Sequence, residues 1–427
     1  MSAPTYQRNQ ANQTNQADPS PPTSLPVLAL RRGEDRRLTA GHLWIFSNEV
    51  DVAKTPLTSF APGDCVRVES AQGRPLGSAY VNPGALIAGR VYCQDATRPL
   101  DAELLRSRLK SALALRQSLF ALPYYRLVFG EGDLLPGLVV DRFGDILAVQ
   151  IGTAGMERVR GEIISALTDL LAPTGILLKN DLPGRELEGL ARGVEVAQGQ
   201  VPDEAEIEEN GCRFVFPLAG GQKTGWFYDM RATRALAASL SSNVTGGRKV
   251  LDVFSYAGGL GLACARAGAA SVVCLDASHT ALEYAAKSAA LSGLADRVET
   301  LCVDAMSGLK DLRASGQRFG LVSVDPPAFV KRRKDLEKGL AAYRTVNRLA
   351  LDLVEDNGFF VSCSCSQHVG RDDLRKVLSG AGRDAGVRLQ ILTSCHQAAD
   401  HPILPAMPET EYLKGLLCRV TRPGRGQ

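Results

Sequence analysis

Long apolar runs and paired cysteine motifs are missing from this chain of 427 residues. No apolar stretch approaches the roughly 18 residues that a membrane-spanning helix needs, and the N-terminus lacks the charged-then-apolar pattern of an export signal. The ten cysteines are scattered without a Cys-x-x-Cys pair, which is typical of reduced thiols rather than of a disulfide framework or a zinc site. We therefore expect a cytoplasmic protein without a membrane contact and without a metal site.

A strong net charge is also missing. The formal charge is +3 and the isoelectric point is near 8.3, which permits a nucleic-acid partner without demanding one. A basic footprint would therefore have to be local. Four arginines ahead of the first predicted strand are candidates for phosphate contacts, and a solvated charged face explains them equally well: Arg31, Arg32, Arg36 and Arg37.

The length of the chain indicates several domains, and the pattern changes along it. Residues 1–24 are rich in Gln, Asn, Ser and Pro and are expected to be a disordered tail. Residues 25–98 alternate short strand patterns with turns, as in a small β barrel, and residues 99–210 indicate a middle α+β domain. That middle domain is expected to contain a helix over 100–120 and a second single helix over about 156–171, and to end in an acidic connector over 198–210. Residues 211–427 alternate strands and helices, which predicts a parallel sheet covered on both faces and an α/β fold class.

A glycine-rich turn stands at the centre of that last region. The stretch Leu251–Gly268 reads as a strand, a turn through Gly258, Gly259 and Gly261, and a helix. Such a turn can present backbone N–H groups to a ligand, although tight-turn geometry alone also explains the glycines. Asp276 closes the next strand, where an acidic residue reaches the hydroxyls of a ribose, and Asp304 closes the one after, placed to accept from an adenine amine. Each carboxylate alone is also a good helix N-cap.

Two further motifs separate methyl transfer from hydride transfer. Asp325-Pro326-Pro327-Ala-Phe329 predicts a stiff extended loop that can grip the polar edge of a flat base, with Phe329 available for stacking; a simple proline turn is the alternative. Cys365 lies at the rim of the next strand, where a partly ionised thiol could add to C6 of a pyrimidine and activate C5. A small buried cysteine is the plainer interpretation of a strand thiol.

Together these motifs resemble the ribosomal RNA large-subunit methyltransferase I family of S-adenosylmethionine-dependent cytosine-C5 methyltransferases. The matching segments follow the order of the family: His42-Leu-Trp-Ile-Phe-Ser47, Tyr125-Arg-Leu-Val-Phe129, Leu135-Pro-Gly137 with Asp141-Arg-Phe-Gly-Asp145, Lys223-Thr-Gly225 with Asp229-Met-Arg231, the glycine turn, Asp325-Pro-Pro-Ala-Phe329, Ser364-Cys-Ser366, and Gln397-Ala-Ala-Asp-His-Pro402 with Tyr412-Leu-Lys-Gly415. The resemblance implies a PUA-like RNA-binding barrel, a middle α+β domain and a C-terminal Rossmann-like class I methyltransferase domain. It also implies ribosomal RNA as the partner and favours Cys365 over Cys363 as the nucleophile.

The expected site follows from these assignments. We expect Cys365 and Asp325 to be catalytic, with Pro326, Pro327 and Phe329 against the base and Arg31 and Arg32 on the RNA backbone. S-adenosyl-L-methionine is expected to lie on the glycine turn and the two strand-end carboxylates, covered by the segment from Lys223 to Arg231. Its predicted contacts are Asp252, Phe254, Ser255, Tyr256, Ala257, Gly258, Gly259, Asp276, Ala277, Asp304, Ala305, Asp325, Lys223, Thr224, Phe227, Asp229 and Arg231.

Two other functions remain open from the sequence. An N-methyltransferase acting on a purine amine in RNA would also use an (Asp/Asn)-Pro-Pro-aromatic loop, but it would need no cysteine. A non-catalytic ribosome-assembly protein would bind RNA through the barrel alone. The sequence leaves the oligomeric state open, a homodimer included.

Overall fold

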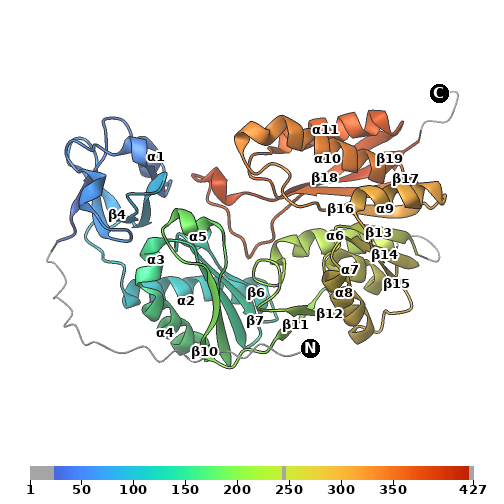
Figure 1. The fold of residues 1–427 in the computed structure, drawn as a ribbon, viewed down its shortest axis with the longest axis horizontal. Helices are drawn as coiled ribbons and strands as arrows, with labels where there is room; N and C mark the ends of the chain where they lie inside the picture. The colour runs from blue at the N-terminus through green and yellow to red at the C-terminus, as the bar shows by residue number, and fades with distance from the viewer. Residues whose placement is uncertain (1–23, 243–246, 423–427) are drawn as a thin grey trace.

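The computed structural model describes residues 24–242 and 247–422, which form three main sheets (Figure 1). The predicted tail, Ser24 excepted, lies outside the described residues. Within the described residues no helix is both long and apolar enough to cross a membrane.

The N-terminal barrel, blue in Figure 1, has five short strands in the order β1-β3-β4-β5-β2. Alternating residues such as Val66 and Val68 of β3 point into its core and are fully buried, as the period-two pattern of the sequence predicts. A short helix, α1 (Arg36–Thr39), precedes β2, and the strands are β1 (Val27–Ala29), β2 (Trp44–Phe46), β3 (Cys65–Glu69), β4 (Pro75–Val81) and β5 (Ile87–Cys93).

The middle region is a five-stranded sheet, β10-β9-β8-β7-β6, with helices packed against it. Its long helix α2 (Ala102–Leu119) begins where Asp101 accepts a hydrogen bond from the Leu104 N–H at 2.8 Å. The single helix expected over 156–171 is instead two, α3 (Ala154–Arg158) and α4 (Arg160–Leu171), separated by the non-helical Val159. The remaining elements are β6 (Tyr124–Phe129), β7 (Leu138–Phe143), β8 (Ile146–Ile151), β9 (Gly175–Asn180), α5 (Gly184–Leu187) and β10 (Gly193–Gly199).

The prediction of an acidic connector over 198–210 is wrong. Residues Glu204–Glu209 form β11, which pairs antiparallel with β12 (Cys212–Pro217). Glutamates alternate here with Ala205 and Ile207, which are buried in the same core as Phe214. The acidic composition therefore obscured the alternating pattern of a strand. Glu209 is itself buried and pairs with Arg234 at 2.6 Å.

The C-terminal sheet has seven strands in the order β15-β14-β13-β16-β17-β19-β18. The first five are parallel, as predicted, whereas β19 runs antiparallel to both β17 and β18; these last two strands were not anticipated. The strands are β13 (Lys249–Val253), β14 (Ser271–Asp276), β15 (Val298–Cys302), β16 (Phe319–Val324), β17 (Val354–Ser364), β18 (Arg388–His396) and β19 (Lys414–Thr421).

Helices cover both faces of this sheet (Figure 1). One core contains side chains of α6, α7 and α8, and a second contains side chains of α9, α10 and α11 on the opposite face. Two covered faces explain why every residue of β16 is buried and why all but Ser323 of its side-chain-bearing residues are apolar. The helices are α6 (Arg231–Ser241), α7 (Gly259–Arg266), α8 (His279–Leu291), α9 (Ala305–Ala314), α10 (Leu336–Leu351) and α11 (Arg371–Asp384).

One segment between β18 and β19, Gln397–Leu413, contacts all three sheets, and we call it the bridging segment. Met407 is fully buried in the core of the N-terminal barrel, and Glu409 lies 3.3 Å from His42. At its other end Leu413 lines the cavity described below. The barrel, the middle sheet and the cavity are thus connected through one stretch of chain.

Candidate active site

A cavity of about 490 Å³ opens at the carboxyl ends of the parallel strands. Open α/β sheets bind ligands at this edge, because the loops that follow neighbouring strands converge there. Sixteen of the predicted residues line it together: Lys223, Phe227, Asp229, Asp252, Phe254, Ser255, Tyr256, Gly259, Asp276, Ala277, Asp304, Ala305, Asp325, Pro326, Pro327 and Cys365.

The glycine turn is held in place by Asp252, at the end of β13. Its Oδ2 accepts a hydrogen bond from the Gly261 N–H at 2.9 Å, which ties the strand to the start of α7. Gly261 packs so closely that a Cβ there would lie 2.8 Å from Cys274 Sγ. Burial raises the pKa of Asp252 to about 7, against the opposing effect of the Gly261 hydrogen bond. Gly258 adopts a left-handed φ of 75° and shapes the turn without lining the cavity.

The carboxylates after β14 and β15 are fixed by backbone N–H groups. Asp276 accepts from Tyr256 N and Ser278 N, each at 2.9 Å, so it joins the glycine turn to the end of β14. Asp304 caps α9 by accepting from Met306 N at 3.0 Å, which is the N-cap role weighed from the sequence. A carboxylate has about four acceptor positions, so both residues retain capacity for a ligand hydroxyl or amine.

Asp325 and Asp229 form the acidic wall of the cavity. Burial alone would raise the pKa of Asp229, but Lys223, His401 and a hydrogen bond from the Tyr412 hydroxyl together lower it to about 2. Burial, followed by the charge of Asp229, raises the pKa of Asp325 to about 6. Two carboxyl groups in one cavity therefore have different environments, an arrangement characteristic of acid–base sites.

Cys365 lies opposite the Pro-Pro loop, with Sγ 4.0 Å from the Pro326 carbonyl oxygen. Burial and the charge of Asp325 raise the pKa of its thiol, against the opposing effect of Lys223. The structure therefore does not support the sequence-based expectation of a partly ionised thiol, because burial and the neighbouring carboxylate both favour the protonated form. Cys363 is fully enclosed and does not line the cavity.

The strand end that carries Cys365 is clamped by hydroxyl groups. Ser364 and Ser366 each lie 2.9 Å from the Tyr343 hydroxyl, and Ser366 Oγ accepts from Val330 N at 3.2 Å. Lys414 Nζ donates to the Ser366 carbonyl at 2.8 Å. These bonds connect β17, α10 and the loop after Pro327, and so fix the thiol relative to Asp325.

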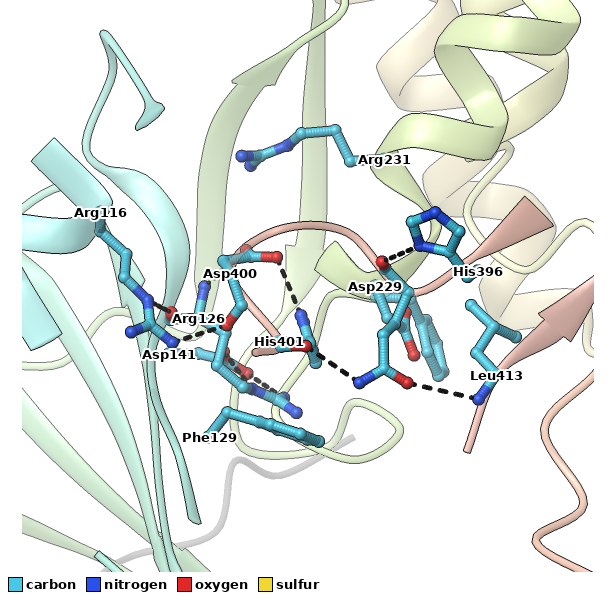
Figure 2. A network of polar contacts seen from close by, with 12 residues as sticks. Arg116, Arg126, Phe129, Asp141, Asp229, Arg231, His396, Asp400, His401 and Leu413 are labelled. Carbon is cyan, nitrogen blue, oxygen red and sulfur yellow. Dashed lines mark hydrogen bonds and ion pairs between the residues drawn. The ribbon is translucent and has the colours of Figure 1, made fainter. Parts of the chain in front are cut away.

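A buried polar network behind the cavity joins it to the middle sheet (Figure 2). Arg116 pairs with Asp133 at 2.5 Å and donates to the Asp400 carbonyl at 2.7 Å. Asp400 in turn lies 2.8 Å from His401 Nδ1. The Tyr412 hydroxyl then donates to Asp229, so the bridging segment positions a cavity carboxylate directly.

Several predicted residues lie outside the cavity lining. The hydroxyl of Thr224 donates to Asp141 of the middle sheet, and Arg231 pairs with Glu209 at 3.1 Å with its guanidinium over the Phe120 ring. Phe329 packs against Tyr343 instead of facing the cavity, where Ala328 takes its place. Ala257 and Gly258 form the turn beneath the lining, while Arg31 and Arg32 are exposed on the barrel.

The sequence analysis missed several lining residues. Trp226 and Gln222 belong to the segment predicted to cover the site, so their position was a usable signal. Arg234 lies over the Trp226 ring at 4.6 Å and depends on Glu209, which was assigned to a connector. Leu413 comes from the far end of the chain and gave no local signal. The other missed residues are Met230, Leu260, Ser323 and Ala328.

The cavity suits a polar ligand that is partly aromatic and partly charged. The hydroxyls of Ser255 and Ser323 and Oδ1 of Asp229 are buried without a hydrogen-bond partner among the residues that the structure describes, and all three residues line the cavity. Because an unpaired buried polar atom costs about 1–3 kcal/mol, such groups indicate a ligand that supplies the partners. The residues present thus fit S-adenosylmethionine, with its amino-acid, ribose and adenine groups.

Comparisons with known proteins agree with this geometry. Residues 28–94 match a PUA-like domain and residues 191–419 match an S-adenosylmethionine-dependent methyltransferase family. A ribosomal RNA large subunit methyltransferase I from Salmonella arizonae is 33% identical over 400 residues, covering 92% of this chain and 98% of that protein. Its counterpart from Tolumonas auensis is 35% identical over 396 residues, covering 91% of this chain and 98% of that protein.

The fold is also that of solved methyltransferases. A Streptococcus mutans protein described as an S-adenosylmethionine-dependent methyltransferase superposes with a TM-score of 0.78 at 19% identity, covering 92% of this chain and 100% of its own. A second structure with the same scores is described as a methyltransferase complexed with SAH. From the family matches and the identity over nearly the whole chain, this protein belongs to the ribosomal RNA large subunit methyltransferase I family and is an S-adenosylmethionine-dependent methyltransferase with an N-terminal PUA-like domain.

Proposed function

We propose that this protein methylates C5 of a cytosine in large-subunit ribosomal RNA, in the cytoplasm, through an adduct on Cys365. The observation that carries the proposal is that Cys365 and Asp325 line the same cavity. The relatives of this chain are named ribosomal RNA large subunit methyltransferases, which supports ribosomal RNA as the substrate. An aromatic carbon is a poor nucleophile, so methylation at C5 calls for covalent activation, whereas methylation of an amine does not.

The cofactor contacts belong to this proposal as well. Asp276 would hold the ribose, Asp304 the adenine, and the turn around Ser255 the amino-acid end, with Asp252 beneath. The cofactor supplies an electrophilic methyl group when it is bound. The buried hydroxyls of Ser255 and Ser323 support this placement, because they offer unpaired donors and acceptors to it.

Asp325 is suited to move a proton in the proposed reaction. A pKa of about 6 lets its carboxylate accept the proton of the Cys365 thiol and then deliver it to N3 of the cytosine. The sulfur would form a bond to C6 as the C5–C6 electron pair becomes available at C5, and C5 would then form the bond to the methyl group while the bond between that methyl group and the cofactor sulfur breaks. A base would take the C5 proton, and the electrons of that C–H bond would expel the sulfur from C6. N3 would return its proton through Asp325 to the departing sulfur, which restores the aromatic ring and the thiol.

Nucleoside mass spectrometry of ribosomal RNA from cells lacking the protein tests the chemistry. The proposal expects one site to lose 5-methylcytidine, and loss of a methylated purine amine would establish the N-methyltransferase alternative. In purified protein, Cys365→Ala should abolish methyl transfer while calorimetry shows cofactor binding retained. Cys363→Ala, two positions away on the same strand, is the matched control and should keep activity. Full turnover by Cys365→Ala would refute the adduct.

A further inference from the structure

Four consecutive basic residues, Lys331-Arg332-Arg333-Lys334, directly follow the Pro-Pro loop, and we call them the basic rim. All four are exposed. Arg332 pairs with Asp335 at 3.1 Å, whereas the other three make no ion pair within residues 24–242 and 247–422. In a chain with 49 basic and 46 acidic residues, four consecutive basic residues, three of them without an ion pair in the described residues, are a marked local concentration of positive charge.

The basic rim is anchored at the mouth of the cavity. Val330, immediately before it, is 2% exposed and donates its N–H to Ser366 Oγ at 3.2 Å, next to Cys365. Ala328 lines the cavity, and the three Cα-to-Cα steps from Ala328 to Lys331 span at most about 11 Å. After the rim the chain enters α10, whose Tyr343 packs against Phe329 with ring centroids 4.8 Å apart. The charges are therefore held beside the opening and not on a free loop.

We propose that the basic rim binds the phosphates of the RNA strand on either side of the target nucleotide. The proposal rests on the proposed function, in which a nucleotide of an RNA chain enters this cavity. When a base is drawn out of its stack, its two flanking phosphates stay at the mouth of the pocket, and that is where this cationic segment lies. Lys and Arg on the backbone fix the register of the strand without reading its sequence. The rim thus supplies a second RNA contact, separate from the PUA-like barrel.

The triple variant K331Q/R333Q/K334Q tests the inference, because these exposed side chains make no ion pair in the described structure. We expect the KM for an in vitro transcript of large-subunit ribosomal RNA to rise about tenfold or more, with kcat at saturating RNA and cofactor affinity unchanged. The logarithm of RNA affinity against the logarithm of salt concentration should also lose roughly 2 from its slope, at about 0.7 per lost single-strand phosphate contact. The matched control K249Q/R297Q/R318Q removes three exposed charges from the opposite edge of the sheet, where β13, β15 and β16 begin, and should change neither quantity.

Binding is measured directly by fluorescence anisotropy, separately from methylation. An unchanged RNA affinity and salt slope in the rim variant would overturn the inference, and would point instead to a protein partner or a solvated surface. An equal loss in the control variant would overturn it too, since the effect would then come from net charge. If the wild-type protein bound RNA through the rim but made no 5-methylcytidine, the proposed function would fail while the rim assignment stood.

Discussion

Asp252→Asn isolates the energetic effect of one buried carboxyl group beneath the glycine turn. Asp252 is 3% exposed, and its Oδ2 holds the Gly261 N–H at 2.9 Å. An asparagine of the same shape can accept that hydrogen bond through its side-chain oxygen, so the turn is kept while the titrating group is removed. Any change in the pH dependence of stability then comes from ionisation and not from a lost contact.

The magnitude follows from the pKa of Asp252, which burial raises from 3.8 to about 7. At a pH below both pKa values, the Asp252 carboxyl is protonated in the folded and in the unfolded state, so it does not affect stability. Between them the folded state keeps a proton that the unfolded state has lost, so stability falls as the pH rises, until the loss is complete above about pH 7. At about 1.4 kcal/mol per pKa unit, the wild type should lose about 3 kcal/mol from this group between about pH 5 and pH 8, and Asp252→Asn should not.

Urea unfolding of the cofactor-free protein measures this difference. The chain has two tryptophans, and in a Trp44→Phe background Trp226, which is 1% exposed beside the cavity, reports on the methyltransferase core alone. A single-region probe is needed because several domains do not unfold as one two-state unit. Asp311→Asn, an exposed carboxylate on α9, is the matched control. The reasoning is refuted if Asp252→Asn and the wild type show parallel stability curves from about pH 5 to pH 8.

Three further substitutions probe the supports of the cavity. Tyr343→Phe removes the hydroxyl between Ser364 and Ser366, so kcat should fall about tenfold with cofactor affinity retained by calorimetry, and an unchanged kcat would contradict the clamp. Arg116→Met leaves the buried Asp133 without its cation and should cost about 3–5 kcal/mol of unfolding free energy, seen as a lower Tm by calorimetry; an unshifted Tm would contradict this. Met407→Ala should cost about 2–5 kcal/mol in the barrel core and speed its digestion in limited proteolysis, whereas unchanged digestion would mean the contact is dispensable.

Local patterns in the sequence were sufficient for most of the fold. The parallel strands are apolar runs between helical segments. Gly258 is suited to the left-handed conformation of the turn, and the Asp101 carboxylate is suited to cap the start of a helix. Where the sequence misled, the pattern was ambiguous. β11 alternates correctly through Ala205 and Ile207, but its glutamates resemble those of a solvated linker. The antiparallel β19 carries an apolar run like those of the parallel strands of the same sheet, and periodicity does not encode the direction of a strand.

The sequence could predict only those cavity residues that follow the ends of the predicted parallel strands. The carboxylates at the ends of β14 and β16 converge because parallel strands share an edge, which the sequence implies. Hydrogen bonds between residues far apart in the sequence, such as Tyr412 with Asp229 or Thr224 with Asp141, hold the site in place. The local sequence pattern does not predict such pairs. The raised pKa of the Cys365 thiol is likewise a property of burial, and burial depends on the whole surrounding structure.

The bridging segment has a consequence for the order in which the chain is made. The core of the N-terminal barrel includes Met407, and His42 meets Glu409, 367 positions further along the sequence. At about 5–20 residues per second, a ribosome needs roughly 20–70 seconds to add the residues between that pair. During this interval the residues of the barrel have been made, but the Met407 side chain that completes their core has not. The bridging segment therefore completes both the barrel core, through Met407, and the lining of the methyltransferase cavity, through Leu413.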